Sequence, residues 1–154
     1  MRGIFWLCFF FFAPVSFANQ NVLLHQIEHL EHHESKPQFF KHHQLLFFFA
    51  STCPHCHKAA PSLKAWADLH HADVMAVSFD RQPLPEFPQM AEVSDALIQT
   101  AYAGQNVTFP ALFIINNQTN QLYLALMGEW TKSELEHRLK ALIAKIERYE
   151  GEHG

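Results

Sequence analysis

Two cysteines, Cys53 and Cys56, are separated by two residues in the segment CPHC. The segment follows a continuous apolar run at 44–50, QLLFFFA, which has the length and composition of a buried β-strand, and it opens a stretch of helical character. The free N–H groups and the dipole at a helix N-terminus stabilise a cysteine thiolate. Such a thiolate attacks a disulfide, and a second thiol one helical turn away resolves the mixed disulfide. We therefore predict dithiol–disulfide exchange, with Cys53 as the nucleophile and Cys56 as the resolving thiol.

The two residues between the cysteines, Pro54 and His55, are expected to tune this chemistry. A hydrogen-bond donor or positive charge on His55 would stabilise the Cys53 thiolate, and with it the reduced form, which makes the disulfide a stronger oxidant. A purely structural disulfide across so short a loop would be strained and would add little stability. Structural zinc is the other alternative, but it usually needs a second pair of ligands and the chain has no second CxxC. We expect no metal and no cofactor at the Cys53–Cys56 pair.

Residues 1–18 have the layout of a secretory signal peptide. One arginine precedes an unbroken apolar run at 4–13, which is too short to span a bilayer, and Ser16 and Ala18 provide the small residues of a cleavage site. An uncleaved anchor is the alternative. Cleavage would remove Cys8, so the three cysteines of the chain would become one pair in an oxidising compartment. These features predict export to the periplasm.

The composition also limits the class of protein. The 154 residues suit one domain, and a formal net charge of -4 with only 11 Lys and Arg argues against a nucleic-acid binder. His25, His29 and His33 recur at helical spacing beside His32, a pattern that can hold a transition metal. No cysteine or carboxylate clearly completes such a site, so a solvated, pH-sensitive polar face is the favoured interpretation.

The hydrophobic pattern predicts an α/β sandwich with a mixed central sheet. The expected elements are a helix at 21–34, a strand at 44–50, a helix at 53–69, a strand at 73–79, a short helix at 92–102, strands at 111–115 and 121–127, and a last helix from 131 to 146. The strand–helix–strand unit favours a parallel crossover, and the last two strands suit a hairpin. Thr131 and Glu134 form a capping box for the last helix. The predicted domain spans 44–148, between an N-terminal helical segment at 19–43 and a C-terminal tail at 149–154.

The segment CPHCHKAAPSLKAWAD resembles the active-site helix of the thioredoxin superfamily, with Pro61 in the place of the proline that kinks this helix. The Pro54–His55 dipeptide is typical of DsbA-type periplasmic oxidases, and Gly128 matches the family's glycine before the last helix. The resemblance covers about residues 44–146. It implies a thioredoxin-like three-layer sandwich.

The segment FPALF, which begins with Phe109 and Pro110, resembles the cis-proline segment of the same superfamily. A cis X-Pro bond is uncommon and generally reflects a required turn. The resemblance implies that the backbone of Phe109 lies beside Cys53, where it can pair with an extended substrate strand. An ordinary trans proline at the start of a strand is the alternative interpretation.

The sequence departs from the superfamily pattern in ways that narrow the choice. The strand at 44–50 has no carboxylate for the proton of Cys56, so water or a loop acid must take it. Ser51 and Thr52 replace the usual tryptophan before the first cysteine, which argues against cytosolic-type reductases and the WCxxC reductases of cytochrome c maturation. The chain also lacks room for the helical insertion of DsbA, and 19–43 is too short for the dimerisation domain of the dimeric isomerases.

A short exported chain with a proline-rich middle loop is most similar to the TraF/TrbB group of F-type conjugation. That similarity implies a periplasmic thiol-disulfide isomerase or oxidoreductase of pilus assembly. Its substrates would be disulfide-bearing proteins of the transfer apparatus, and its redox partner would be a membrane protein of DsbB or DsbD type. Two alternatives stay open, a general DsbA-like disulfide oxidase and a metal- or protein-binding thioredoxin-fold component of a secretion apparatus. The Pro54–His55 dipeptide favours oxidation, whereas the resemblance to the TraF/TrbB group favours isomerisation.

Overall fold

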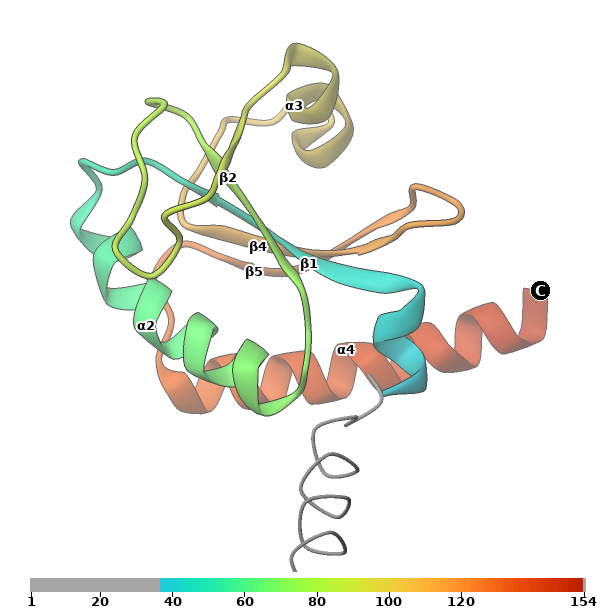
Figure 1. Ribbon diagram of the computed structural model, residues 1–154. Coiled ribbons are helices and arrows are strands. Elements are labelled where there is room, and N and C mark those ends of the chain that lie inside the picture. Colours follow the sequence, from blue (N-terminus) through green and yellow to red (C-terminus); the bar gives the residue numbers. More distant parts are fainter. Residues whose placement is uncertain (1–36, 154) are drawn as a thin grey trace, which may run out of the picture. The chain divides into compact units, whose positions relative to one another are not determined.

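The computed structural model describes residues 37–153, which form one unit (Figure 1). The predicted signal peptide and the predicted histidine-rich helix at 21–34 lie outside the described residues. The elements in chain order are η2 (Gln38–Lys41), β1 (His43–Phe49), α2 (Pro54–Leu69), β2 (Val74–Ser78), β3 (Ala91–Glu92), α3 (Asp95–Tyr102), β4 (Ala111–Asn116), β5 (Leu122–Met127) and α4 (Lys132–His153). No helix between residues 37 and 153 is both long and apolar enough to cross a membrane.

The five strands form one mixed sheet in the order β3-β2-β1-β4-β5. β1 pairs with β2 in parallel and with β4 in antiparallel orientation, so Phe48 lies between Val77 and Ala111. β4 and β5 form the predicted antiparallel hairpin. The sequence does not predict β3, because its two residues are exposed and carry no hydrophobic pattern. The mixed α/β fold with a central β1 is confirmed.

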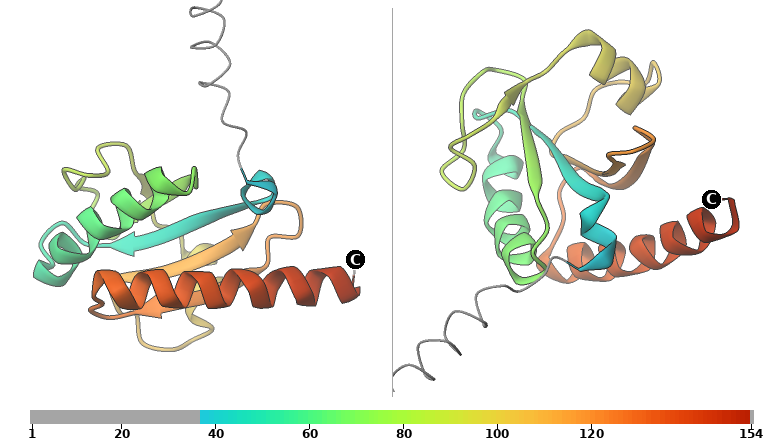
Figure 2. Two further views of the ribbon diagram at one scale, coloured as in Figure 1. Left: turned by 90° about the horizontal axis from the view of Figure 1, so that it is seen from below. Right: turned by 45° about the vertical axis from the view of Figure 1, so that its right-hand side comes forward.

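Helices cover both faces of the sheet, as a three-layer sandwich requires (Figures 1 and 2). Alternate side chains of β1 point to opposite faces, so the central strand contributes to two cores. Phe47 and Phe49 belong to the core under α2 and α4, whereas Leu46 and Phe48 belong to the core under α3. All four side chains are fully buried. A continuous apolar run is therefore the right pattern for β1, since both of its faces are covered.

The start of α4 carries the predicted capping box. The Glu134 N–H donates to Thr131 Oγ1 at 3.2 Å, and the Glu134 carboxylate accepts the Thr131 N–H at 2.7 Å. These reciprocal bonds satisfy backbone groups that the first turn of a helix leaves free. Trp130, just before this cap, is buried in the core.

The end of α4 differs from the prediction, because the helix continues through the residues assigned to a C-terminal tail. Glu150 Oε1 accepts hydrogen bonds from Asn116 Nδ2 and the Tyr123 hydroxyl, both at 2.9 Å, and lies 3.2 Å from His43 Nε2. These contacts tie the last turns of α4 to β1, β4 and β5. Residues 149–153 are therefore part of the folded unit and not a tail.

Candidate redox site

Cys53 is the N-cap residue of α2, and Pro54 is the first helical residue. The Cys53 backbone is extended, with φ -85° and ψ 114°, and its Sγ accepts the N–H of Cys56 at 3.4 Å. The sulfur thus takes the place of a capping oxygen at the positive end of the helix dipole. A negative charge on this sulfur would gain a hydrogen bond, which is the arrangement expected for a nucleophilic cysteine.

Cys56 lies one turn into α2 and is fully buried, whereas Cys53 is partly exposed. Both are free thiols in the structure. Burial and the hydrogen bond with Cys53 raise the pKa of Cys56 to about 12. At neutral pH Cys56 therefore holds its proton, and Cys53 is the thiol that another protein can reach.

The segment before β4 lies beside Cys53. The Phe109–Pro110 peptide is cis, as the resemblance to thioredoxins implied. The carbonyl oxygen of Phe109 is 3.9 Å from Cys53 Sγ, so this backbone and the reactive sulfur share one surface. The Pro110 carbonyl accepts the N–H of Gly128 at 2.8 Å, which joins the segment to the chain that leaves β5.

Asp80, in the loop after β2, anchors the turn that leads into Cys53. Its Oδ2 accepts the Ser51 N–H and the Ser51 hydroxyl, both at 2.8 Å, and the Thr52 N–H at 3.3 Å. Its Oδ1 accepts the Ser78 hydroxyl at 2.9 Å. The two residues that replace the usual tryptophan before the motif are thus both donors to one carboxylate.

These hydrogen bonds also determine the protonation state of Asp80. Burial raises the pKa of Asp80, but the bonds from Ser51, Ser78, Gln82 and Thr52 outweigh this effect and hold it at about 2. A carboxylate this acidic is a poor acceptor for the proton of Cys56. The sequence predicts that either a loop acid or water takes this proton, and Asp80 does not suit the role of the loop acid.

His55, inside the motif, and His57, directly after it, have different partners. His57 Nε2 donates to the Ser51 carbonyl at 2.6 Å, so His57 also holds the turn before Cys53. His55 Nδ1 lies 2.7 Å from Glu129 Oε2, and Lys58 Nζ lies 3.2 Å from Glu129 Oε1. His55 was expected to stabilise the Cys53 thiolate, and in the structure its Nδ1 lies against the Glu129 carboxylate. Within residues 37–153 there is no group of three histidine, cysteine or acidic side chains arranged to hold a metal ion.

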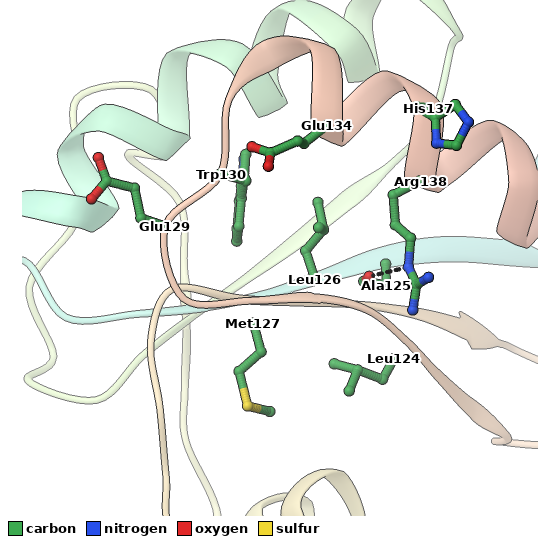
Figure 3. A pocket seen from close by; sticks show the side chains of 9 residues that line it. All are labelled: Leu124, Ala125, Leu126, Met127, Glu129, Trp130, Glu134, His137 and Arg138. Carbon is green, nitrogen blue, oxygen red and sulfur yellow. Dashed lines mark hydrogen bonds between the residues drawn. The ribbon is translucent and has the colours of Figure 1, made fainter.

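A shallow pocket of about 410 Å³ lies between β5 and the start of α4 (Figure 3). It is lined by four consecutive residues of β5, by Glu129 and Trp130, and by three side chains of α4. Neither cysteine lines this pocket.

A protein family described as "TraF: F plasmid transfer operon protein" matches residues 13–140 of the sequence, which is most of the chain. The chain belongs to the TraF family. Among proteins of curated function, none matches this TraF-family chain significantly.

Solved structures similar to this TraF-family protein have a thioredoxin fold. A thioredoxin-family thiol:disulfide interchange protein from Chlorobium tepidum superposes with a TM-score of 0.51, at 16% identity, over 68% of this chain and 82% of the other. A DsbE-type protein from the same organism gives a TM-score of 0.48 at 20% identity, over 68% and 82% of the two chains. A secreted Mycobacterium tuberculosis disulfide oxidoreductase gives 0.41 at 23% identity, over 65% and 81%. The first superposition supports the thioredoxin-like fold predicted for the TraF-family chain.

Two acidic residues of the site were not identified from the sequence of this TraF-family protein. Asp80 follows β2, which pairs in parallel with β1. The carboxyl ends of neighbouring parallel strands meet at one edge of a sheet. The position of Asp80 next to the end of β1 could therefore have been predicted from the sequence. Glu129 has no comparable signal, because it reaches His55 only through the turn at Gly128.

Proposed function

We propose that this protein is a periplasmic thiol-disulfide oxidoreductase that acts on exported proteins through Cys53 and Cys56. The observation that carries the proposal is the position of Cys53 Sγ, which accepts a helix N-terminal N–H and faces the Phe109 carbonyl, above a buried thiol. One sulfur is accessible and stabilised as an anion, and the other is close but shielded. This asymmetry is what sequential attack and resolution require.

In the reducing direction, the Cys53 thiolate attacks a client disulfide. A bond forms between Cys53 and one client sulfur, and the other client sulfur leaves as a thiolate. Cys56 then loses its proton to water and attacks Cys53 Sγ, which releases the second client thiol and leaves the Cys53–Cys56 disulfide. Two electrons pass from the protein to the client in this direction, and oxidation of a client is the reverse.

Phe109 and Pro110 are proposed to bind the client. The Phe109 backbone, 3.9 Å from Cys53 Sγ at its carbonyl, is placed to pair with an extended client segment while the sulfurs react. Pro54 and His55 are proposed to tune the stability of the Cys53 thiolate. Membership of the TraF family supports clients among disulfide-bearing proteins of a conjugative transfer apparatus. A membrane partner of DsbB or DsbD type would return the Cys53–Cys56 pair to its starting redox state.

Replacement of Cys56 tests the proposal. In Cys56→Ala the mixed disulfide cannot be resolved, so Cys53-linked partners should accumulate in cells and disappear on reduction. In the matched Cys53→Ala variant no partner should be trapped. Failure of Cys56→Ala to trap any protein would overturn the proposal.

The in vivo redox state of the pair distinguishes the two forms of the activity. Thiol trapping that finds Cys53 and Cys56 mostly oxidised in the periplasm indicates a disulfide oxidase. A mostly reduced pair indicates an isomerase or a reductase, since both activities start from the free Cys53 thiolate.

A further inference from the structure

We propose that Glu129 is a positioning residue that lowers the oxidising strength of the Cys53–Cys56 pair by engaging the His55 ring. The inference rests on the proposed function, because it concerns the equilibrium between the dithiol and the disulfide. A CPHC motif alone predicts a strong oxidant, and Glu129 is the group that moderates it here.

The geometry that supports this role is a carboxylate shared between a histidine ring and a lysine of α2. One Glu129 oxygen lies 2.7 Å from His55 Nδ1, and the other lies 3.2 Å from Lys58 Nζ. Glu129 comes from the loop between β5 and α4, and Figure 3 shows its carboxylate apart from that of Glu134. The contacts therefore join two parts of the chain that are distant in sequence.

The backbone that carries Glu129 is held in place. Gly128 has φ +83°, a left-handed conformation that favours glycine, and its N–H is bonded to the Pro110 carbonyl at 2.8 Å. Glu129 thus follows directly on a residue tied to the segment beside Cys53. Its carboxylate is placed by the fold and does not depend on a long flexible loop.

The electrostatic effect follows from what these contacts neutralise. The first turn of α2 contains no acidic residue, so Glu129 supplies the negative charge beside His55 and Lys58. Lys58 and His55 lower the pKa of Glu129, so the carboxylate is ionised at neutral pH. With Nδ1 of His55 engaged and the charge balanced, the thiolate and hence the reduced form lose stabilisation. The disulfide becomes a weaker oxidant, which suits a protein that must also spend time reduced.

The test is the equilibrium of the full chain with glutathione, in which protein disulfide and two GSH give protein dithiol and GSSG. Glu129→Gln should raise the equilibrium constant about tenfold towards the dithiol, which is about 30 mV more oxidising. Glu134→Gln is the matched control, because Glu134 has the same charge, is exposed and caps α4 without contacting α2. It should leave the constant unchanged within about twofold.

A His55→Ala background shows whether Glu129 acts through His55. In that background Glu129→Gln should raise the equilibrium constant by only about twofold, because the imidazole is gone. Thermal unfolding should change little in Glu129→Gln, since exposed ion pairs contribute little to stability. An equilibrium constant that does not rise in Glu129→Gln, or an equal rise in the His55→Ala background or in Glu134→Gln, would overturn the inference. A wild-type protein that does not exchange with glutathione at all would instead overturn the proposed function.

Discussion

Asp80 accepts both the backbone N–H and the hydroxyl of Ser51, each at 2.8 Å, across 29 positions of sequence. This pair of bonds joins the end of β2 to the end of β1, where the chain turns towards Cys53. Asp80 thereby fixes the turn that leads into Cys53.

Asp80→Asn should destabilise the protein by about 1 to 3 kcal/mol, because an amide cannot accept all of the bonds that the carboxylate accepts. The pKa of Asp80 in the folded protein is about 2, below the ordinary 3.8, so the stability it contributes is present above pH 3.8 and is lost as the pH falls through about 2. Urea unfolding at several pH values should show the wild type and the variant converging in acid. Asp68→Asn is the control, since Asp68 pairs with Lys64 at an exposed position. A difference in unfolding free energy between wild type and Asp80→Asn that stays constant from pH 7 to pH 2 would contradict the prediction.

Alkylation of the reduced protein should be confined to one thiol. The pKa of Cys56 is raised to about 12 and its side chain is buried, so it is neither ionised nor accessible at pH 7. Iodoacetamide at pH 7 should therefore modify Cys53 at least about tenfold faster than Cys56, as measured by peptide mass spectrometry. Equal rates at the two positions in folded protein would refute this assignment of the nucleophile.

The reduced protein should lose stability in alkaline solution more steeply than a variant without the buried thiol. Because the folded-state pKa of Cys56 lies near 12 and its ordinary value is 9.0, its contribution is complete below pH 9 and is lost as the pH rises towards 12. The slope from one such group approaches about 1.4 kcal/mol per pH unit. Burial also raises the pKa of Tyr102 to about 12, so Cys56→Ser, which keeps this tyrosine, is the reference. The prediction would be disproved if the unfolding free energies of wild type and Cys56→Ser changed equally with pH between pH 9 and pH 11.

Glu150→Ala should loosen the end of α4 without affecting exchange at Cys53. The substitution removes the acceptor of the bonds from Asn116 and Tyr123 and the partner of His43, at the opposite end of β1 from the motif. We expect a loss of about 1 to 3 kcal/mol in the free energy of unfolding and faster amide exchange in the last turns of α4. Glu152→Ala, at an exposed position on the same turns, should have little effect. Protection of residues 147–153 that survives in Glu150→Ala would show that other contacts hold the helix end.

The features predicted correctly are those whose physical cause is local. The run at 45–50 is apolar at every position because both faces of β1 are buried, and its composition indicates this directly. Thr131 and Glu134 are three residues apart, so their reciprocal cap is visible in the sequence. Cys53 and Cys56 are likewise one helical turn apart, and α2 begins at this motif as predicted.

The features that were missed depend on contacts between distant residues. β3 consists of two exposed residues and exists because β2 offers it a free edge. The helical state of 149–153 depends on contacts such as that between Glu150 and His43, which are 107 positions apart. No propensity or periodicity in those residues indicates which side chains will meet them.

For the site, the sequence by itself determined the pair of thiols, their spacing and the helix at whose start Cys53 lies. Only the tertiary structure decided how they are tuned. It places Asp80 on the turn before Cys53, and it places Glu129 on His55, the histidine that the sequence assigned to the thiolate. Electrostatic tuning depends on distances through space, and those distances are set when the strand ends and loops of the fold come together.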